Sequence, residues 1–245
     1  EVLKEAQDLG FAEANPTADV DGFDVQAKIA LLARLGIGTY VESTTVETTG
    51  ISRITKHDFA YAAHLKATIK LLGIARMNNG ELTIAVAPHV VPRTNAIANI
   101  SGATNIVNVQ SKNLGSSFFI GPGAGGDPTG NSVVSDIISL AQGQASIPFP
   151  KTVPTKRAAD FDSRFYIRFV IKDGIGIIKR IADACVDNDI SIISIEQSSE
   201  YQDRTYLPFV VTTDVVAISK VKAFAEQVGK EDFNVEQPFY MPILA

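Results

Sequence analysis

The sequence predicts an α+β protein in two blocks: a mixed or antiparallel sheet with helices on one face, followed by a smaller βαββαβ unit. Three observations support this. Strand-like runs dominate the middle of the first block, a proline-rich stretch at Ile147–Pro154 interrupts the periodic segments, and strand and helix patterns alternate beyond it. We therefore expect one domain over residues 1–146, a linker over 147–163 and a second domain over 164–245.

Composition limits the function classes. The chain has 245 residues, 45% hydrophobic and 20% charged, which argues against disordered and collagen-like proteins. A net charge of −5 without a basic block argues against nucleic-acid binding. No apolar stretch approaches the roughly 20 residues that span a bilayer, and no secretory signal is visible. We expect a soluble, cytoplasmic protein without nucleic-acid or membrane partners.

Helical spacing is the main signal at the start of the first block. Glu1–Leu9 reads as a short helix, and a polar, turn-rich stretch separates it from a second helix at Phe23–Leu35. Thr55 and Asp58 are spaced as a capping box. They predict the start of a long helix that continues to Leu72.

Strand signals follow the turn sequence Asn78-Asn79-Gly80. Three runs, Leu82–Ala87, Asn105–Gln110 and Ser116–Ile120, are spaced as in a meander, which predicts an antiparallel sheet. Ser132–Ala141 then reads as a helix.

The second block has the element order of the split, ferredoxin-like βαββαβ unit. Its expected strands and helices alternate in this order: Phe165–Ile171, helix Ile177–Asp187, Ile190–Gln197, Leu207–Thr212, helix Ile218–Val228 and Val235–Pro242.

A glycine motif, Gly121-x-Gly123-x-x-Gly126, lies between a strand and a helix, as a dinucleotide fingerprint does. A dinucleotide fold also needs a return strand and an acidic ribose ligand about 20 residues later, whereas this helix leads into the proline-rich linker. Two other interpretations stay open. The glycines let the backbone approach an anion at a helix start, or they form a tight packing turn.

Asp24 and Lys28 lie four residues apart on one expected helix, so their side chains point the same way. Such pairs are common as solvated ion pairs of little energetic value. Lys28 is, however, followed by the apolar run Ile29–Ala33. A lysine that is partly desolvated and oriented by an acid can donate or accept a proton. Glu13, in the loop just upstream, could hold a substrate ammonium group.

The sequence gives little support for a metal site or for a reactive or disulfide-bonded cysteine. His57, His64 and His89 form no ligand pattern with acids or with Cys185, so we expect no metal site. Cys185 is the only cysteine, which excludes an intrachain disulfide. It reads as a small core residue.

Two turns of the second block offer either ordinary βα and αβ connections or a ligand pocket. Lys172–Ile177 joins a strand to a helix, and Asn188-Asp189 leads into the strand that begins Ile190-Ser191. The functional alternative is a small-ligand pocket between the helix start and the second strand, completed by a second copy of the domain.

Several uncommon strings occur together and in order, and with them the chain resembles homoserine dehydrogenase over nearly its whole length. The strings are Gly10–Asp19, Gly22–Lys28, Ile54-Thr55 with Asp58, Ile69–Ala75, Val91-Pro92, and Gly123–Gly126 with Pro128-Thr129. The second block is similar to an ACT domain, a regulatory module that binds amino acids. It departs from that pattern at Ile175, where a proline often precedes Gly176.

The resemblance implies NAD(P)-dependent interconversion of L-homoserine and L-aspartate 4-semialdehyde, a step in threonine, methionine and isoleucine biosynthesis. It implies that Lys28 is the general acid, that Asp24 and Glu13 bind the substrate, and that Gly10, Glu13 and Gly125 approach the cofactor.

The ACT similarity implies a regulatory ligand near Gly176, Asn188 and Ser191, with threonine as the candidate effector. The family resemblance also implies a homodimer or homotetramer. NAD and NADP are not distinguished, because the ribose-reading segment of such enzymes is absent from this sequence.

The family has an N-terminal nucleotide-binding domain that this sequence lacks. We therefore expect this chain to be the substrate, dimer-forming and regulatory portion of the enzyme, inactive alone. Two alternatives stay open: a non-catalytic amino-acid-binding protein on a dehydrogenase-like scaffold, and a dehydrogenase for another small aldehyde.

Overall fold

A computed structural model describes residues 4, 7, 14–144, 152–158, 160–197, 203 and 205–244. Gly10, Glu13 and most of the helix expected at Glu1–Leu9 lie outside the described residues.

A long hairpin forms the centre of the first block. Strands β2 (Ala67–Asn78) and β3 (Glu81–Pro92) pair antiparallel from Ala67↔Pro92 to Asn78↔Glu81. The turn residues Asn79 and Gly80 both have positive φ, 49° and 80°, as the two-residue Asn-Gly hairpin turn requires.

The prediction of one helix from Thr55 to Leu72 is wrong in its second half. Helix α4 spans only Lys56–His64; Thr55 and Asp58 do form its capping box. Lys66 has φ 54°, a left-handed conformation that ends the helical path, and the chain then enters β2. Pairing along the whole of β3 outweighs the helical spacing in this segment.

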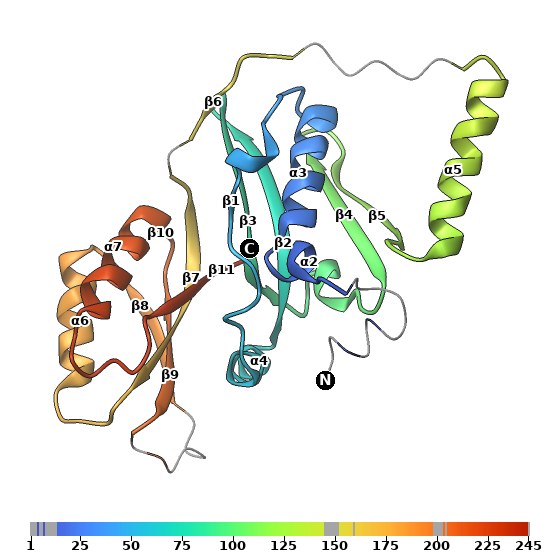
Figure 1. The fold of residues 1–245 in the computed structure, drawn as a ribbon. Helices are drawn as coiled ribbons and strands as arrows, with labels where there is room; N and C mark the ends of the chain where they lie inside the picture. The colour runs from blue at the N-terminus through green and yellow to red at the C-terminus, as the bar shows by residue number, and fades with distance from the viewer. Residues whose placement is uncertain are drawn as a thin grey trace.

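Helices α2 (Thr17–Val20) and α3 (Phe23–Gly36) lead onto this hairpin, and α3 lies against it (Figure 1). The α3 residues Ile29 and Ala33 share a buried cluster with Leu82, Ile84 and Val86 of β3.

One mixed sheet runs through both blocks. Among the described residues it has nine strands, with the central order β1-β3-β11-β7-β9-β8. Strands β1 (Glu47–Thr48), β6 (Lys156–Arg157) and β11 (Phe239–Ile243) run parallel to β3. The other pairings are antiparallel. The final strand β11 lies between β3 and β7 and so joins the two blocks.

The second block has the predicted βαββαβ order. Its elements are β7 (Asp162–Ile171), α6 (Ile177–Asp187), β8 (Ile192–Gln197), β9 (Leu207–Thr213), the short β10 (Val216–Ala217), α7 (Ile218–Gly229) and β11. Helices α6 and α7 cover one face of its sheet. Helix α4 of the first block covers the opposite face, where Tyr61 and Ala62 share a buried cluster with Tyr166, Val210 and Met241.

The predicted meander is wrong in its pairing. Strands β4 (Thr104–Ser111) and β5 (Gly115–Pro122) form their own two-stranded sheet and do not extend the main one. Helix α5 (Gly126–Ala141) follows, has no buried residue and stands apart from the other helices (Figure 1). Short 3₁₀ turns occur at Ser43–Thr45 and Ala96–Asn99.

Candidate active site

Glycines fix where helix α3 begins. Gly22 has φ 82°, a conformation that favours glycine, and a Cβ there would lie 3.2 Å from Thr48 Cγ2 and 3.3 Å from Val86 Cγ1. Gly50 is tighter still, because a Cβ would lie 2.3 Å from the Val20 carbonyl oxygen. The neighbouring Ile51 N–H donates to that same oxygen at 2.8 Å. The chain entering α3 is therefore held closely against the β1 region.

Asp24 and Lys28 form the predicted pair on α3. Lys28 Nζ donates to Asp24 Oδ2 at 2.6 Å, and the side chains are 51% and 41% exposed for Lys28 and Asp24 respectively. Elsewhere on the same helix, the Gln26 side-chain amide donates to Val46 O and Thr48 Oγ1, both at 2.9 Å. Thus α3 is anchored through Gln26, while Asp24 and Lys28 remain accessible. An ammonium with three N–H donors can hold this carboxylate and still reach a substrate oxygen.

Glu13 and Gly10 lie outside the described residues, so their predicted contacts with substrate and cofactor remain predictions. The described chain resumes at Ala14 and enters α2 with the Asn15 side chain accepting from Thr17 N–H at 3.2 Å.

Gly125 precedes helix α5 with φ 113° and ψ 158°, a conformation essentially restricted to glycine. Around the position of a Cβ, Pro128 Cδ is the one atom that the described residues place within 4 Å, at 3.6 Å, apart from the neighbours in the chain. As far as the described residues go, this backbone can be approached closely. Gly123 differs, because a Cβ there would overlap the side chain of Asn105, which makes it a packing glycine.

The residues predicted to hold a regulatory ligand are divided between two ends of a helix. Gly176 caps the start of α6 with φ 87°, and Asn188 caps its end beyond the 11 residues of the helix, about 18 Å away. Asn188 Nδ2 donates to Ala184 O at 2.8 Å and to Gln227 Oε1 at 2.7 Å. Ser191 follows Asn188 three residues later in the chain, and its backbone carbonyl accepts a hydrogen bond from Asp214 N–H at 2.8 Å. Within one chain, Gly176 is therefore separated from Asn188 and Ser191 by the length of helix α6.

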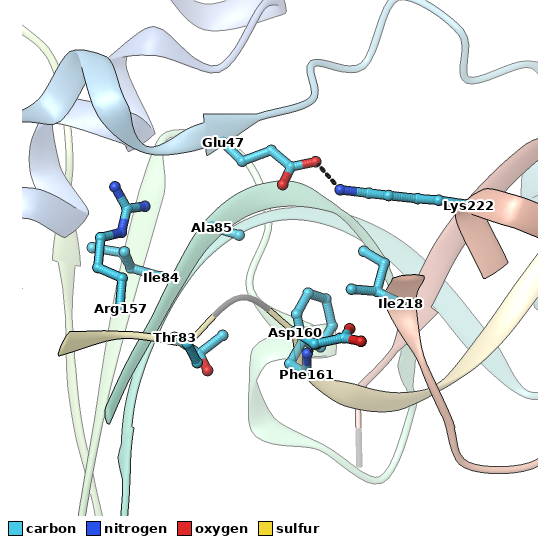
Figure 2. A pocket seen from close by; sticks show the side chains of 10 residues that line it. Glu47, Thr83, Ile84, Ala85, Arg157, Asp160, Phe161, Ile218 and Lys222 are labelled. Atoms are coloured by element: carbon cyan, nitrogen blue, oxygen red, sulfur yellow. Dashed lines mark hydrogen bonds and ion pairs between the residues drawn. The ribbon is translucent and has the colours of Figure 1, made fainter. Parts of the chain in front are cut away.

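A small cavity of about 80 Å³ lies where β3, the segment before β7 and helix α7 meet, and it contains none of the residues predicted for catalysis (Figure 2). Its charged groups have partners of their own. Glu47 Oε1 and Lys222 Nζ pair across it at 2.6 Å, and the Asp160 carboxylate accepts from Ser219. The first contact joins the two blocks, and the second joins the segment before β7 to helix α7.

Other chemistry has little structural support. Cys185 is buried, and burial raises the pKa of its thiol to about 11. In the part of the chain that the structure describes, no group of three or more His, Cys, Asp or Glu side chains could hold a metal ion. None of the helices described there combines the length and apolar character that crossing a bilayer requires.

Sequence reasoning missed a buried polar cluster between the blocks. The Arg168 guanidinium on β7 pairs with the Asp58 carboxylate at the start of α4, with side chains 3% and 0% exposed respectively. The Tyr166 hydroxyl donates to Asp58 Oδ1 at 2.8 Å, and burial with the nearby Asp58 charge raises the pKa of that hydroxyl. The signal was an arginine within the apolar strand Phe165–Ile171. Its partner could not be predicted, since 110 residues separate them.

Comparison with known proteins is consistent with this architecture. The family model described as homoserine dehydrogenase matches residues 1–138, which include α3 and its Asp24–Lys28 pair. A homoserine dehydrogenase from Bacillus subtilis (strain 168) is 36% identical over 204 residues, covering 80% of this chain and 47% of that protein. Another, from Synechocystis sp., is 34% identical over 261 residues, covering 100% of this chain and 60% of that protein.

Solved structures agree in fold. The crystal structure of a homoserine dehydrogenase from Thiobacillus denitrificans superposes with a TM-score of 0.86 at 29% identity, covering 99% of this chain and 57% of that chain. The S. aureus homoserine dehydrogenase at pH 6.5 has a TM-score of 0.73 at 24% identity, which supports the fold alone. The chain spans about half to three fifths of the length of these relatives. With more than half of its residues matched by the family model, the chain belongs to the homoserine dehydrogenase family.

Proposed function

We propose that this chain supplies the substrate-binding and proton-transfer portion of an enzyme that interconverts L-homoserine and L-aspartate 4-semialdehyde with NAD or NADP. The observation that carries the proposal is the Asp24–Lys28 pair at 2.6 Å, accessible on a helix that the homoserine dehydrogenase model covers.

The pair suits carbonyl reduction. Reducing the aldehyde carbon requires a hydride, which the bound nicotinamide supplies, and a proton for the carbonyl oxygen. Lys28 Nζ donates that proton as negative charge develops on the oxygen, and in the oxidation of homoserine it accepts the hydroxyl proton. Asp24 orients the ammonium of Lys28 and offers its second carboxylate oxygen to the substrate's amino group.

The backbone at Gly125 is suited to close approach by the cofactor. Its glycine-restricted backbone angles, with only Pro128 of the described residues near the position of a Cβ, would allow a nicotinamide nucleotide to approach the start of α5. Gly10 and Glu13 would complete that contact. The choice between NAD and NADP depends on a ribose-reading segment that is not in this sequence.

The second block supports regulation by an amino acid. Its βαββαβ order fits an ACT-type module, with threonine as the effector to test first. Because Gly176 and Asn188 lie at opposite ends of α6, we propose that a second copy of the chain completes the ligand site. A homodimer or homotetramer then follows as the working assembly.

Calorimetric titration of this chain with L-homoserine and with L-threonine tests the proposal. We expect both to bind, and Asp24→Asn to weaken homoserine binding at least about tenfold by removing an ionic contact to the substrate. Asp183→Asn is the matched control, because Asp183 pairs with Lys179 at the same i,i+4 spacing and 2.6 Å distance on α6. Threonine binding without homoserine binding would favour the non-catalytic amino-acid sensor instead.

A further inference from the structure

Helix α4 belongs to the first block, yet it packs on the sheet of the second. Tyr61 is 3% exposed, and its hydroxyl donates to Pro208 O of β9 at 2.9 Å. The same helix closes a buried cluster with Ala67 and Ile69 at the start of β2. Any displacement of the second block's sheet therefore acts on α4 and on β2 together.

Arg168 is the buried charged contact at this junction. Besides Asp58, its guanidinium donates to Arg53 O at 3.3 Å and to Thr55 Oγ1 at 3.2 Å, and it lies 5.2 Å from the centroid of the Phe239 ring. These acceptors surround the first turn of α4. A buried ion pair adds little net stability compared with apolar packing, and in some proteins its role is instead to fix one arrangement of the parts that it joins.

Strand β2 connects helix α4 with the candidate active site, because its first residues contact α4 and Gly73 further along contacts α3. A Cβ at Gly73 would lie 2.9 Å from Ile29 Cβ and 3.0 Å from Val25 Cγ1, so these α3 side chains pack directly on the β2 backbone. Val25 and Ile29 adjoin Asp24 and Lys28 in the same helix. Tightly packed elements of this kind transmit a displacement, because no void absorbs it.

We propose that Arg168 is a positioning residue: through Asp58 it holds α4, and through β2 it sets the helix that carries Asp24 and Lys28. Through this buried ion pair, which is one of several contacts between the blocks, the second block thereby acts on the substrate site. The inference rests on the proposed function for its consequence in catalysis and regulation, but its structural part can be tested separately.

The test compares this chain with the double variant Arg168→Met/Asp58→Asn. This variant removes both charges at similar volume and leaves an amide that can still accept from Thr55 N–H and contact Tyr166. The control is Lys230→Met/Glu226→Gln, an exposed i,i+4 pair on the second block. The readouts are amide hydrogen exchange within α3 and the Kd of L-homoserine.

We expect α3 amides to exchange about tenfold faster in the double variant and the Kd for homoserine to rise about tenfold, with the control unchanged. A merely local role would accelerate exchange around residues 53–60 and leave α3 as in the wild type, which would overturn the proposal. If the double variant does not fold, the same exchange measurement on Arg168→Lys tests the proposal. This variant keeps the charge but not the forked contacts, and wild-type exchange in α3 would again overturn the proposal.

Failure of the two proposals can be told apart. If the wild-type chain binds no homoserine, the proposed function is at fault, and the exchange measurement on α3 still decides the role of Arg168.

Discussion

Gly73 lets side chains of helix α3 pack directly on the backbone of strand β2. The atoms that a Cβ would meet, in Val25 and Ile29, belong to residues on either side of Lys28 in the chain. The glycine therefore serves both the packing of the core and the placement of the candidate proton donor.

Substituting Gly73 tests that role. Gly73→Ala should destabilise the chain by about 1–3 kcal/mol, because the added methyl group overpacks the helix–strand contact. Gly36→Ala is the control: outside its own helix, the described residues place no atom within 4 Å of a Cβ there, and alanine in a helix should be neutral or stabilise by about 0.5–1 kcal/mol. Urea denaturation measures both, and equal effects would contradict the packing argument.

His89 gives the chain a pH-dependent stability. It is 7% exposed on β3, and desolvation lowers its pKa from 6.5 to about 4. Between those values the unfolded chain binds a proton that the folded chain does not. Stability is therefore full above pH 6.5 and falls as the pH drops toward 4, by about 3 kcal/mol for this group.

The free energy of unfolding at pH 7.5 and pH 4.5 measures the effect. In His89→Gln the loss on acidification should be smaller than in the wild type by most of that amount. His64→Gln, at an exposed position, is the matched histidine control. An unchanged pH dependence in His89→Gln would show that His89 titrates normally.

At the scale of elements, helix α7 depends on a residue outside itself. Its own N-cap position, Ala217, has no side-chain oxygen, and Asp160 takes that role by accepting from Ser219 N–H at 3.1 Å. Although desolvation raises the pKa of Asp160, the hydrogen bonds from Ser219, Phe161 and Ile218 together outweigh it and the pKa is lowered. The contribution is therefore present at neutral pH and is lost as the pH falls below 3.8.

Asp160→Ala should accordingly cost about 1 kcal/mol at pH 7 and less at pH 3. Asp162→Ala, at the exposed start of β7, serves as the control in the same thermal unfolding series. A cost that does not change between pH 7 and pH 3 would exclude a capping carboxylate.

The helices and strands differ in how well a single sequence could predict them. The boundaries of α6 and the start of α7 follow directly from apolar spacing and turn residues, because both helices bury one face in a local unit. Strand β2 was missed because Leu65, Ile69 and Leu72 are equally compatible with a helix, and only pairing with β3 decides. The Asn79-Gly80 turn was the available signal, since a two-residue hairpin turn implies a strand on each side.

At the scale of the whole molecule, part of the segment predicted as a linker belongs to a sheet that continues through both blocks. Proline content indicated a joint, and Lys156–Arg157 nevertheless forms a strand on β3, while β11 returns from the end of the chain to lie between β3 and β7. Contacts between residues so distant in sequence leave no local pattern. For the same reason Asp24 and Lys28 could be paired from spacing, whereas Asp58 and Arg168 could not.

The central claim concerns Lys28 as the proton donor, and turnover tests it most directly. The measurement is homoserine-dependent reduction of NAD and of NADP by the complete gene product, wild type against Lys28→Met, with Lys179→Met of the matched exposed pair as control. We predict turnover by the wild type and the control, and a loss of about 10²–10⁴-fold in kcat for Lys28→Met with its fold intact. Wild-type turnover in Lys28→Met would contradict the account, as would a folded wild-type protein that reduces neither cofactor.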